Sequence, residues 1–425
     1  MTTSALFVAY RAATALVEPA GRTFLGWRLK RGKEDAVRIG ERLGRPGRLR
    51  PPGRLVWLHG ASVGEGVSLL PLIDALVEHG CHVLVTTGTV NSARVLMGRL
   101  PAGVTHQFVP LDLPGAVRRF LGFWRPDLAV LAESELWPNL VHGLDRAGIP
   151  LVLVNARLSA RSARRWSRAP GFIGAMLGRT ALCLCQTAED AERFTALGAA
   201  RVETAGHLKF DVPPPVADPA AASEFAARMG GRPVWVAAST HADEEAALIE
   251  AHGLLRRDLD DVLTILVPRQ PERGAALREE ARRRGIPAAL RSRHEVLQRG
   301  TALYIADTLG ELGLFYRVSD AVFVGKSLTP PGGGQNPIEP AKLGCAVLHG
   351  PYTGNFAEIY ADLDAAGGAV AVDDATELAE TLTVLLSDTA RLRLVARAAA
   401  EVVERRAGAT GRVMAALEPF LAGTP

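Results

Sequence analysis

One carboxylate, Glu65, stands where a strand-like run ends in a turn of small residues. The run covers residues 54–59, the turn is Gly60–Gly64, and a helix-like run, Val67–Val77, follows. Ligands of open α/β sheets bind beyond the carboxyl ends of the strands, so Glu65 is placed to act as a general base. The turn also fits the G-x-S-x-G pattern, in which Ser62 would be the nucleophile of a hydrolase. A third interpretation is an ordinary strand-to-helix turn whose carboxylate favours the helix dipole.

Other polar side chains follow later strand-like runs of the first half. Glu133 and Glu135 come directly after a buried apolar run, and Arg157 and Arg161 follow the next one. Arginine side chains suit phosphate and carboxylate ligands, although a solvated helix face would also contain them. Lys209 closes this half and could offset negative charge on a transferring group, unless it is an ordinary surface lysine.

The second half has its own series of polar and glycine-containing segments, again after strand-like runs. They are Ser239 and Thr240; Pro268 and Arg269; Leu309, Gly310 and Glu311; Ser327; and Asn336, Pro337, Ile338 and Glu339. Hydroxyls and backbone amides at a helix start can bind an anion, or can simply cap the helix. A carboxylate such as Glu339 can accept hydrogen bonds from ribose hydroxyls. The turn after residue 59 contains neither a G-x-x-x-x-G-K-[ST] phosphate loop nor a complete G-x-G-x-x-G pattern.

Alternating strand-like and helix-like runs must position these residues. Most strand-like runs are continuous apolar segments, which is typical of buried parallel sheets. We expect strands at Leu55–His59, Val83–Thr87, His106–Val109, Leu128–Ala132, Leu151–Asn155, Leu182–Gln186, Val202–Thr204, Val234–Ala238, Leu263–Val267, Leu303–Ala306, Ala321–Val324, Ala346–Leu348 and Ala369–Val372. A proline-rich stretch, Asp211–Pro219, predicts a stiff linker between two doubly wound halves, with a ligand cleft between them.

Bulk composition agrees with two domains that have large hydrophobic cores, and it adds a basic arm. The chain has 425 residues, 48% of them hydrophobic, and its four cysteines are scattered without metal-ligand spacing, which fits a reducing setting. Residues 1–50 hold eleven Lys and Arg against four Asp and Glu. This excess indicates an anionic partner, either a membrane or a nucleic acid. The apolar run Ser4–Val17 is shorter than the roughly 20 residues that span a bilayer, so we expect an interfacial helix or an ordinary packed one.

Taken together, the motifs resemble the 3-deoxy-D-manno-octulosonic acid (Kdo) transferases of lipopolysaccharide and lipid A biosynthesis. The matching stretches occur in the family's order: HGASVGE, ESELWPN, VNARLSARS, GHLKFD, STHADEE, VPRQPER, DTLGEL, FVGKSL and GGGQNPIEP. The resemblance implies an α/β, GT-B fold: two Rossmann-like doubly wound parallel-sheet domains with an interdomain cleft, plus an amino-terminal membrane-associated helix. The expected divisions are a basic arm (1–50), an acceptor domain (51–210), a linker (211–220) and a donor domain with carboxyl-terminal helices (221–425).

The resemblance also implies an activity. The expected enzyme is an inverting glycosyltransferase that moves Kdo from CMP-Kdo to a tetra-acylated lipid A precursor at the cytoplasmic face of the inner membrane. Glu65 would be the general base, and Glu133 and Lys209 would stabilise the transition state. CMP would bind at Pro268–Arg269, Leu309–Glu311 and Asn336–Glu339, its phosphate or sugar at Ser239, Thr240 and Ser327, and the acceptor at Ser62, Glu135, Arg157 and Arg161.

No cofactor and no metal is expected, because the leaving CMP needs charge neutralisation that Lys209, Arg269 and helix amides can supply. The expected partners are CMP-Kdo, the lipid acceptor and an anionic membrane surface, and no nucleic acid. Three alternatives remain: a GT-B enzyme with another nucleotide sugar, a serine hydrolase using Ser62, and a non-catalytic binding protein that works through the basic arm.

Overall fold

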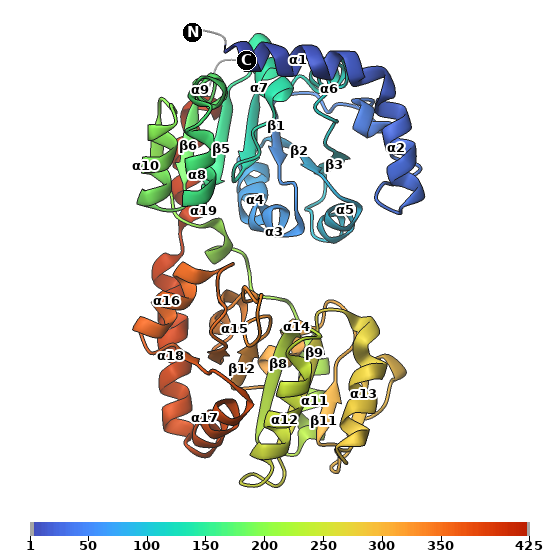
Figure 1. The fold of residues 1–425 in the computed structure, drawn as a ribbon, viewed down its shortest axis with the longest axis vertical. Coiled ribbons are helices and arrows are strands. Elements are labelled where there is room, and N and C mark those ends of the chain that lie inside the picture. The colour runs from blue at the N-terminus through green and yellow to red at the C-terminus, as the bar shows by residue number, and fades with distance from the viewer. Residues whose placement is uncertain (1–3, 423–425) are drawn as a thin grey trace. The chain divides into compact units, whose positions relative to one another are not determined.

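Two seven-stranded parallel sheets organise residues 4–422, the part of the chain that the computed structural model describes. They belong to two units of the chain (Figure 1). The first unit runs to Val212 and takes up the chain again from Arg406, and the second comprises Pro213–Arg405.

The first sheet has the strand order β3-β2-β1-β4-β5-β6-β7. Its strands are β1 (Leu55–His59), β2 (His82–Thr87), β3 (Thr105–Phe108), β4 (Leu128–Ala132), β5 (Leu151–Ala156), β6 (Leu182–Cys185) and β7 (Val202–Thr204). The order reverses between β1 and β4, which is where open α/β sheets bind ligands.

Helices cover both faces of this sheet, because successive side chains of each strand point to opposite faces. Leu55 and Trp57 of β1 pack into one apolar core, and Val56 and Leu58 pack into the other. The helices are α1 (Ala5–Val17), α2 (Gly21–Lys30), α3 (Val63–Ser68), α4 (Leu70–Glu78), α5 (Val90–Met97), α6 (Pro114–Trp124), α7 (Pro138–Arg146), α8 (Ala160–Trp166), α9 (Pro170–Leu177), α10 (Ala188–Ala196) and α19 (Ala409–Leu421), with the 3₁₀ turns η1 (Glu18–Ala20), η2 (Glu41–Leu43) and η3 (Leu208–Phe210).

The basic arm packs on the first unit. Phe7 of α1 is buried in the core beside α7 and α9, and Figure 1 shows α1 lying across the helices of that face. Polar contacts fix the same helix: the Tyr10 hydroxyl donates to Asp112 (3.0 Å), and Asn139 Nδ2 donates to Thr14 Oγ1 (2.9 Å). The arm is therefore built into the unit. Among the helices of residues 4–422, none is both long and apolar enough to cross a bilayer.

The second sheet has the order β10-β11-β9-β8-β12-β13-β14 and reverses between β8 and β12. Its strands are β8 (Val234–Thr240), β9 (Leu263–Pro268), β10 (Ala288–Leu290), β11 (Leu303–Ile305), β12 (Ala321–Val324), β13 (Ala346–His349) and β14 (Ala369–Ala371). Its helices are α11 (Pro219–Met229), α12 (Glu245–Leu255), α13 (Gly274–Arg283), α14 (Leu312–Arg317), α15 (Ile338–Lys342), α16 (Ala357–Ala365), α17 (Ala375–Ser387) and α18 (Thr389–Arg406), with the 3₁₀ turns η4 (Pro271–Arg273) and η5 (Arg291–Arg293).

Three expectations from the sequence need correction. The second domain does not extend through residue 425, because Val413 and Leu417 of α19 are buried in the core of the first unit. The arm of residues 1–50 does not form a separate division. The predicted linker 211–220 is shorter than expected, since α11 begins at Pro219, with Asp218 as its capping residue.

Candidate functional site

Glu65 lies in the first turn of α3, directly beyond the carboxyl end of β1. Its carboxylate accepts a hydrogen bond from the Ala61 amide (Oε2 to N, 2.8 Å). Ser62 caps the same helix: its hydroxyl accepts from the Glu65 amide (3.2 Å). The φ angle of Ser62 is −102°, an extended conformation. A nucleophile elbow holds its serine on a sharp, strained turn, so this geometry argues against the hydrolase.

Glu133 lies directly beyond β4, the strand beside β1 at the reversal of the sheet. Its φ angle is 56°, which is left-handed backbone at a residue that is not glycine. Such a conformation costs about 1–3 kcal/mol and persists where the surroundings enforce it. The Glu133 amide donates to Val154 O of the neighbouring β5 (2.9 Å). Glu133 and Glu65 thus both follow the carboxyl ends of two neighbouring strands, β4 and β1.

Glu133, Lys209, Glu65 and Arg157 interact electrostatically. Burial raises the pKa of Glu133, and the neighbouring Glu65 charge raises it further, whereas Lys209 and Arg157 lower it. Burial lowers the pKa of Lys209, against the attraction of Glu133 and Glu65. The structure thus brings together the three predicted catalytic residues and Arg157. Desolvation by burial strengthens every interaction among these charges.

Lys209 is positioned by two residues that the sequence did not single out for this task. Asn155, fully buried at the end of β5, accepts from the Leu208 amide with Oδ1 (3.2 Å). His207 accepts from the Lys209 amide with Nδ1 (3.2 Å), which forms the start of η3. Burial, together with Lys209, Arg157 and Arg406, lowers the pKa of His207 to about 3, so its ring is neutral. The only sequence signal for Asn155 is a polar residue at the end of an apolar strand.

Glu135 belongs to the same group of charges. Its pKa is raised by burial and by the charges of Glu65 and Glu133, and lowered by the Trp137 indole, which donates to Oε2 (2.8 Å). His59, the last residue of β1, lies with Nε2 3.9 Å from the same oxygen. Burial lowers the pKa of His59 to about 4, and Nδ1 contacts the Thr86 hydroxyl (2.9 Å). His59 was also missed, because it closes a run that is otherwise apolar.

Arg161 is not part of this group. It lies exposed on α8, and within residues 4–422 no ion pair involves it. The neighbouring arginines Arg164, Arg165 and Arg168 are exposed as well. The structure therefore separates the predicted acceptor residues into Glu135, Arg157 and Ser62 near Glu65, and Arg161 on a basic helix.

In the second unit, Ser239 and Lys326 flank the reversal of the sheet, at the ends of β8 and β12. Both have left-handed backbone, with φ of 57° and 59°. The buried Glu244 carboxylate accepts from the amides of Lys326, Ser327 (3.1 Å) and Leu328. This carboxylate thus supplies the hydrogen-bond acceptor for three backbone amides of the loop. Glu244 is thus a residue that organises the loop, and its role was not predicted.

Ser327 and Thr240 are buried, and their hydroxyls contact groups of the protein itself. The Ser327 hydroxyl donates to Val324 O (2.6 Å) and accepts from the Gly350 amide (2.8 Å). The Thr240 hydroxyl lies 3.4 Å from Glu245 Oε1, and both side chains are buried. Their hydroxyls shape the loops, and Ser239 is more accessible than Thr240 or Ser327.

The remaining predicted donor residues also follow strands of the second sheet. Pro268 ends β9, and the exposed Arg269 donates its amide to Thr240 O (2.9 Å). Leu309 is 74% exposed, and Gly310 has a φ of 85°. These two residues and Glu311 precede α14.

Glu311 has a partner that was not predicted. Its Oε2 accepts from Arg291 Nε (2.8 Å), and hydrogen bonding to Arg291 is the main cause that lowers the pKa of Glu311. Near Pro337, Asn336 Nδ2 donates to Glu339 Oε1 (3.2 Å), and Asn336 Oδ1 accepts from the Ile338 amide (3.1 Å). Asn336 thereby orients the carboxylate at the start of α15.

Within residues 4–422, no group of three or more His, Cys, Asp or Glu side chains is arranged to hold a metal ion. The four cysteines are buried and unpaired by disulfides.

Two doubly wound parallel-sheet units, each with polar loops where its sheet reverses, define the class of GT-B folds. A solved glycosyltransferase from Rickettsia africae ESF-5 has the same fold: it is 12% identical, aligns over 88% of this chain and 100% of that chain, and gives a TM-score of 0.60.

Sequence relatives identify the family. A family model described as 3-deoxy-D-manno-octulosonic-acid transferase (kdotransferase) matches residues 37–212. A probable mitochondrial 3-deoxy-D-manno-octulosonic acid transferase of Arabidopsis thaliana is 36% identical over 93% of this chain and 91% of its own length. The 3-deoxy-D-manno-octulosonic acid transferase of Haemophilus influenzae is 32% identical over 97% of this chain and 98% of its own length. The chain belongs to the Kdo transferase family and is a glycosyltransferase.

Proposed function

We propose that the protein transfers Kdo from CMP-Kdo to a hydroxyl of a tetra-acylated lipid A precursor, with inversion at the transferred carbon. The observation that carries this proposal is the electrostatic cluster of the partly buried residues Glu65, Glu133 and Lys209, which lies where the first sheet reverses. Transfer to a sugar hydroxyl needs a base to take the hydroxyl proton and charged groups to stabilise the transition state, and this cluster contains both.

Glu65 is the general base of the proposed reaction. The acceptor hydroxyl oxygen forms a bond to the anomeric carbon of Kdo, and its proton passes to the Glu65 carboxylate. The bond from that carbon to the phosphate oxygen breaks, and CMP leaves with the electron pair. The Ala61 amide holds Glu65 Oε2 at 2.8 Å and so keeps the carboxylate in one orientation.

Glu133 and Lys209 act as a charge pair around the reacting centre. Positive charge on the transferred sugar carbon is favoured by Glu133, and negative charge on the leaving phosphate is favoured by Lys209. Because both groups are already partly buried and close enough to interact, little reorganisation is needed during the reaction. Arg157 lies close enough to lower the pKa of Glu133 and so favours its ionised form.

The second unit is assigned the CMP part of the donor. The exposed Leu309–Glu311 segment offers backbone groups for the base, and Glu339, oriented by Asn336, offers a carboxylate for the ribose hydroxyls. Arg269 supplies positive charge for the phosphate. We propose that no metal takes part, since these groups neutralise the charge of the leaving phosphate.

The test is incubation of the purified protein with freshly generated CMP-Kdo and the tetra-acylated precursor in the presence of EDTA, read by mass spectrometry. Product with added Kdo units supports donor, acceptor and metal independence together. Parallel reactions with UDP-sugars test another donor. Product only from a UDP-sugar would contradict the proposed donor. Product only after a divalent metal is restored would contradict the proposed metal independence.

Glu65→Gln tests the assigned base. We expect turnover to fall by about 10²–10⁴-fold while CMP binding is retained, because the amide keeps the shape of the side chain and cannot take the proton. The matched control is Ser62→Ala, which removes the helix-capping hydroxyl and would abolish the activity of a serine hydrolase. An active Glu65→Gln enzyme would exclude Glu65 as the base.

We also propose that the protein works on the cytoplasmic face of an inner membrane, held by the surface of α1 and α2. Exposed apolar side chains, among them Leu16, Phe24 and Trp27, share this surface with basic residues, and Arg31 lies over the Trp27 ring at 4.0 Å. Such surfaces bind the interface of anionic bilayers. Co-flotation with anionic vesicles that is lost in Phe24→Ser/Trp27→Ser is the expected result, and flotation equal to wild type would contradict it.

A further inference from the structure

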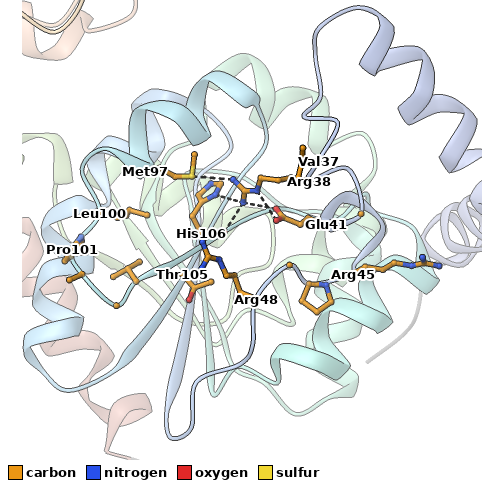
Figure 2. Close-up of a pocket in the computed structure, with 16 residues that line it drawn as sticks. Val37, Arg38, Glu41, Arg45, Arg48, Met97, Leu100, Pro101, Thr105 and His106 are labelled. Carbon is orange, nitrogen blue, oxygen red and sulfur yellow. Dashed lines mark hydrogen bonds and ion pairs between the residues drawn. The ribbon is translucent and has the colours of Figure 1, made fainter.

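A cavity of about 980 Å³ opens in the first unit between the arm and the loop that joins α5 to β3. Figure 2 shows the two sides: residues 37–48 of the arm on one, and residues 97–106 on the other. Its size is at the upper end of the range of about 300–1,000 Å³ found for small-molecule sites. None of the residues assigned to Kdo transfer lines it.

The lining is positively charged. Arg38 is neutralised by Glu41, to which it donates two hydrogen bonds of 2.9 Å, and it also contacts His106 Nδ1 (3.0 Å). Arg45 and Arg48 are exposed, and within residues 4–422 neither has an acidic partner. In Figure 2 the Arg48 side chain extends toward Thr105. The Arg45 side chain extends away from the cavity, so the positive charge of Arg48 is the one left for a ligand there.

The opposite side of the cavity is apolar. Met97, Leu100, Pro101 and Val104 line it, and no Phe, Tyr or Trp does. A nucleobase would lack an aromatic ring to stack on, whereas an aliphatic chain would find a matching surface. Val37, which lines the cavity on the side of the arm, is 93% exposed, and Leu49, which follows the lining residue Arg48, is 89% exposed.

We propose that this cavity binds an amphiphile that carries a phosphate group and an acyl chain. The phosphate contacts the Arg48 guanidinium group, which suits its oxygens, and the chain lies along Met97, Leu100 and Val104. This site is separate from the Glu65 cluster and does not depend on Kdo transfer. Such an amphiphile has two sources: a bilayer phospholipid, or the phosphorylated and acylated acceptor of the proposed function.

Titration calorimetry of the full chain with myristoyl lysophosphatidic acid, below its micelle concentration, tests the site. Monomyristoylglycerol, without a phosphate, and glycerol 3-phosphate, without a chain, are the matched probes. Wild type is expected to bind the first probe at least about tenfold more tightly than either of the others, the scale of one charge-assisted hydrogen bond.

Arg48→Gln should weaken that binding about tenfold, and Leu100→Glu should abolish it. Arg99→Gln is the control, because Arg99 is exposed in the same loop and does not line the cavity. Equal affinities for the three probes would overturn the proposal. So would wild-type binding by Arg48→Gln, a surface variant whose folding is not at risk.

Two further measurements on the Arg48→Gln variant distinguish the two sources of the amphiphile. A raised KM for dispersed acceptor with unchanged kcat would assign the cavity to the acceptor. Weaker flotation with anionic vesicles and an unchanged KM would assign it to the bilayer. Lysophosphatidic acid binding without any Kdo transfer would refute the proposed function and leave the cavity proposal standing.

Discussion

At the scale of single residues, the site depends on backbone conformations that most side chains avoid. Glu133, Asn155, Ser239 and Lys326 all have left-handed backbone and all lie at the carboxyl ends of strands. Strain of this kind gathers at functional sites, where the surrounding structure enforces it. The sequence predicted Glu133 and Ser239 as site residues because they are polar and follow strands. It could not predict their backbone conformation, which comes from neighbouring strands.

Asn155 offers the sharpest test of how Lys209 is positioned. In Asn155→Gly the backbone keeps its φ of 51° without strain, but the acceptor for the Leu208 amide is lost. We expect kcat to fall about tenfold and unfolding free energy to fall by about 1–2 kcal/mol, because a buried donor is left unpaired. Steady-state kinetics and denaturant unfolding measure both. Wild-type kcat in Asn155→Gly would show that Asn155 does not position Lys209, and Asn155→Asp, which keeps an acceptor, should retain more activity.

His59 predicts how stability depends on pH. Its pKa is about 4 in the folded chain, below the ordinary value of about 6.5, because burial disfavours the charged ring. Below pH 6.5 the unfolded chain therefore binds a proton that the folded chain does not. The stability present above pH 6.5 is lost as the pH falls toward 4, by about 3 kcal/mol in all. Unfolding free energies of His59→Gln should fall less steeply in this window, while the exposed control His82→Gln keeps the wild-type slope.

At the scale of elements, the arm completes the edge of the first sheet. β3 is an edge strand, and Glu41 of the arm accepts from its Phe108 amide (2.8 Å), while Arg38 donates to His106 O (3.0 Å). These side chains take the place of a neighbouring strand. Unprotected edges pair with other chains, so the arm also protects the sheet against aggregation.

Glu41→Ala should therefore destabilise the first unit strongly. The change leaves the buried Phe108 amide without its acceptor and removes the carboxylate partner of Arg38, and removing one partner of a buried ion pair costs about 3–5 kcal/mol. Denaturant unfolding followed by Trp fluorescence measures the loss. Glu78→Ala, at an exposed position of α4, is the control and should stay within about 0.5 kcal/mol of wild type. A similar small change in Glu41→Ala would mean that the edge does not need the arm.

Strands were predicted well because buried parallel strands are continuous apolar runs. Leu55–His59, Leu128–Ala132 and Ala321–Val324 have the predicted bounds. The edge strand β10 (Ala288–Leu290) was missed, since three residues in a segment rich in arginine carry no apolar pattern of that length. Helix partners were also beyond prediction: an amphipathic pattern shows that α19 has a buried face, but not which sheet the helix covers.

At the scale of the whole molecule, the first unit is discontinuous in sequence. The chain leaves it at Val212, forms the second unit, and returns at Arg406 so that α19 packs beside α4. The Asp211 carboxylate receives the returning chain through the Gly408 amide (2.7 Å). The proline-rich stretch correctly marked the first crossing, because proline excludes regular structure. The second crossing lies in an Ala- and Arg-rich helical region without any such signal.

Leu417→Ala follows from this return of the chain. Leu417 is fully buried against the first sheet, so its truncation should cost the first unit about 2–5 kcal/mol while the second unit keeps its stability. Native-state hydrogen exchange with mass spectrometry, read on strand peptides of both sheets, separates the two effects. Leu382→Ala, equally buried in the second unit, should give the opposite pattern. Equal loss of protection in both sheets for Leu417→Ala would show that the units unfold together, and the carboxyl-terminal helix would then stabilise the chain as one cooperative body.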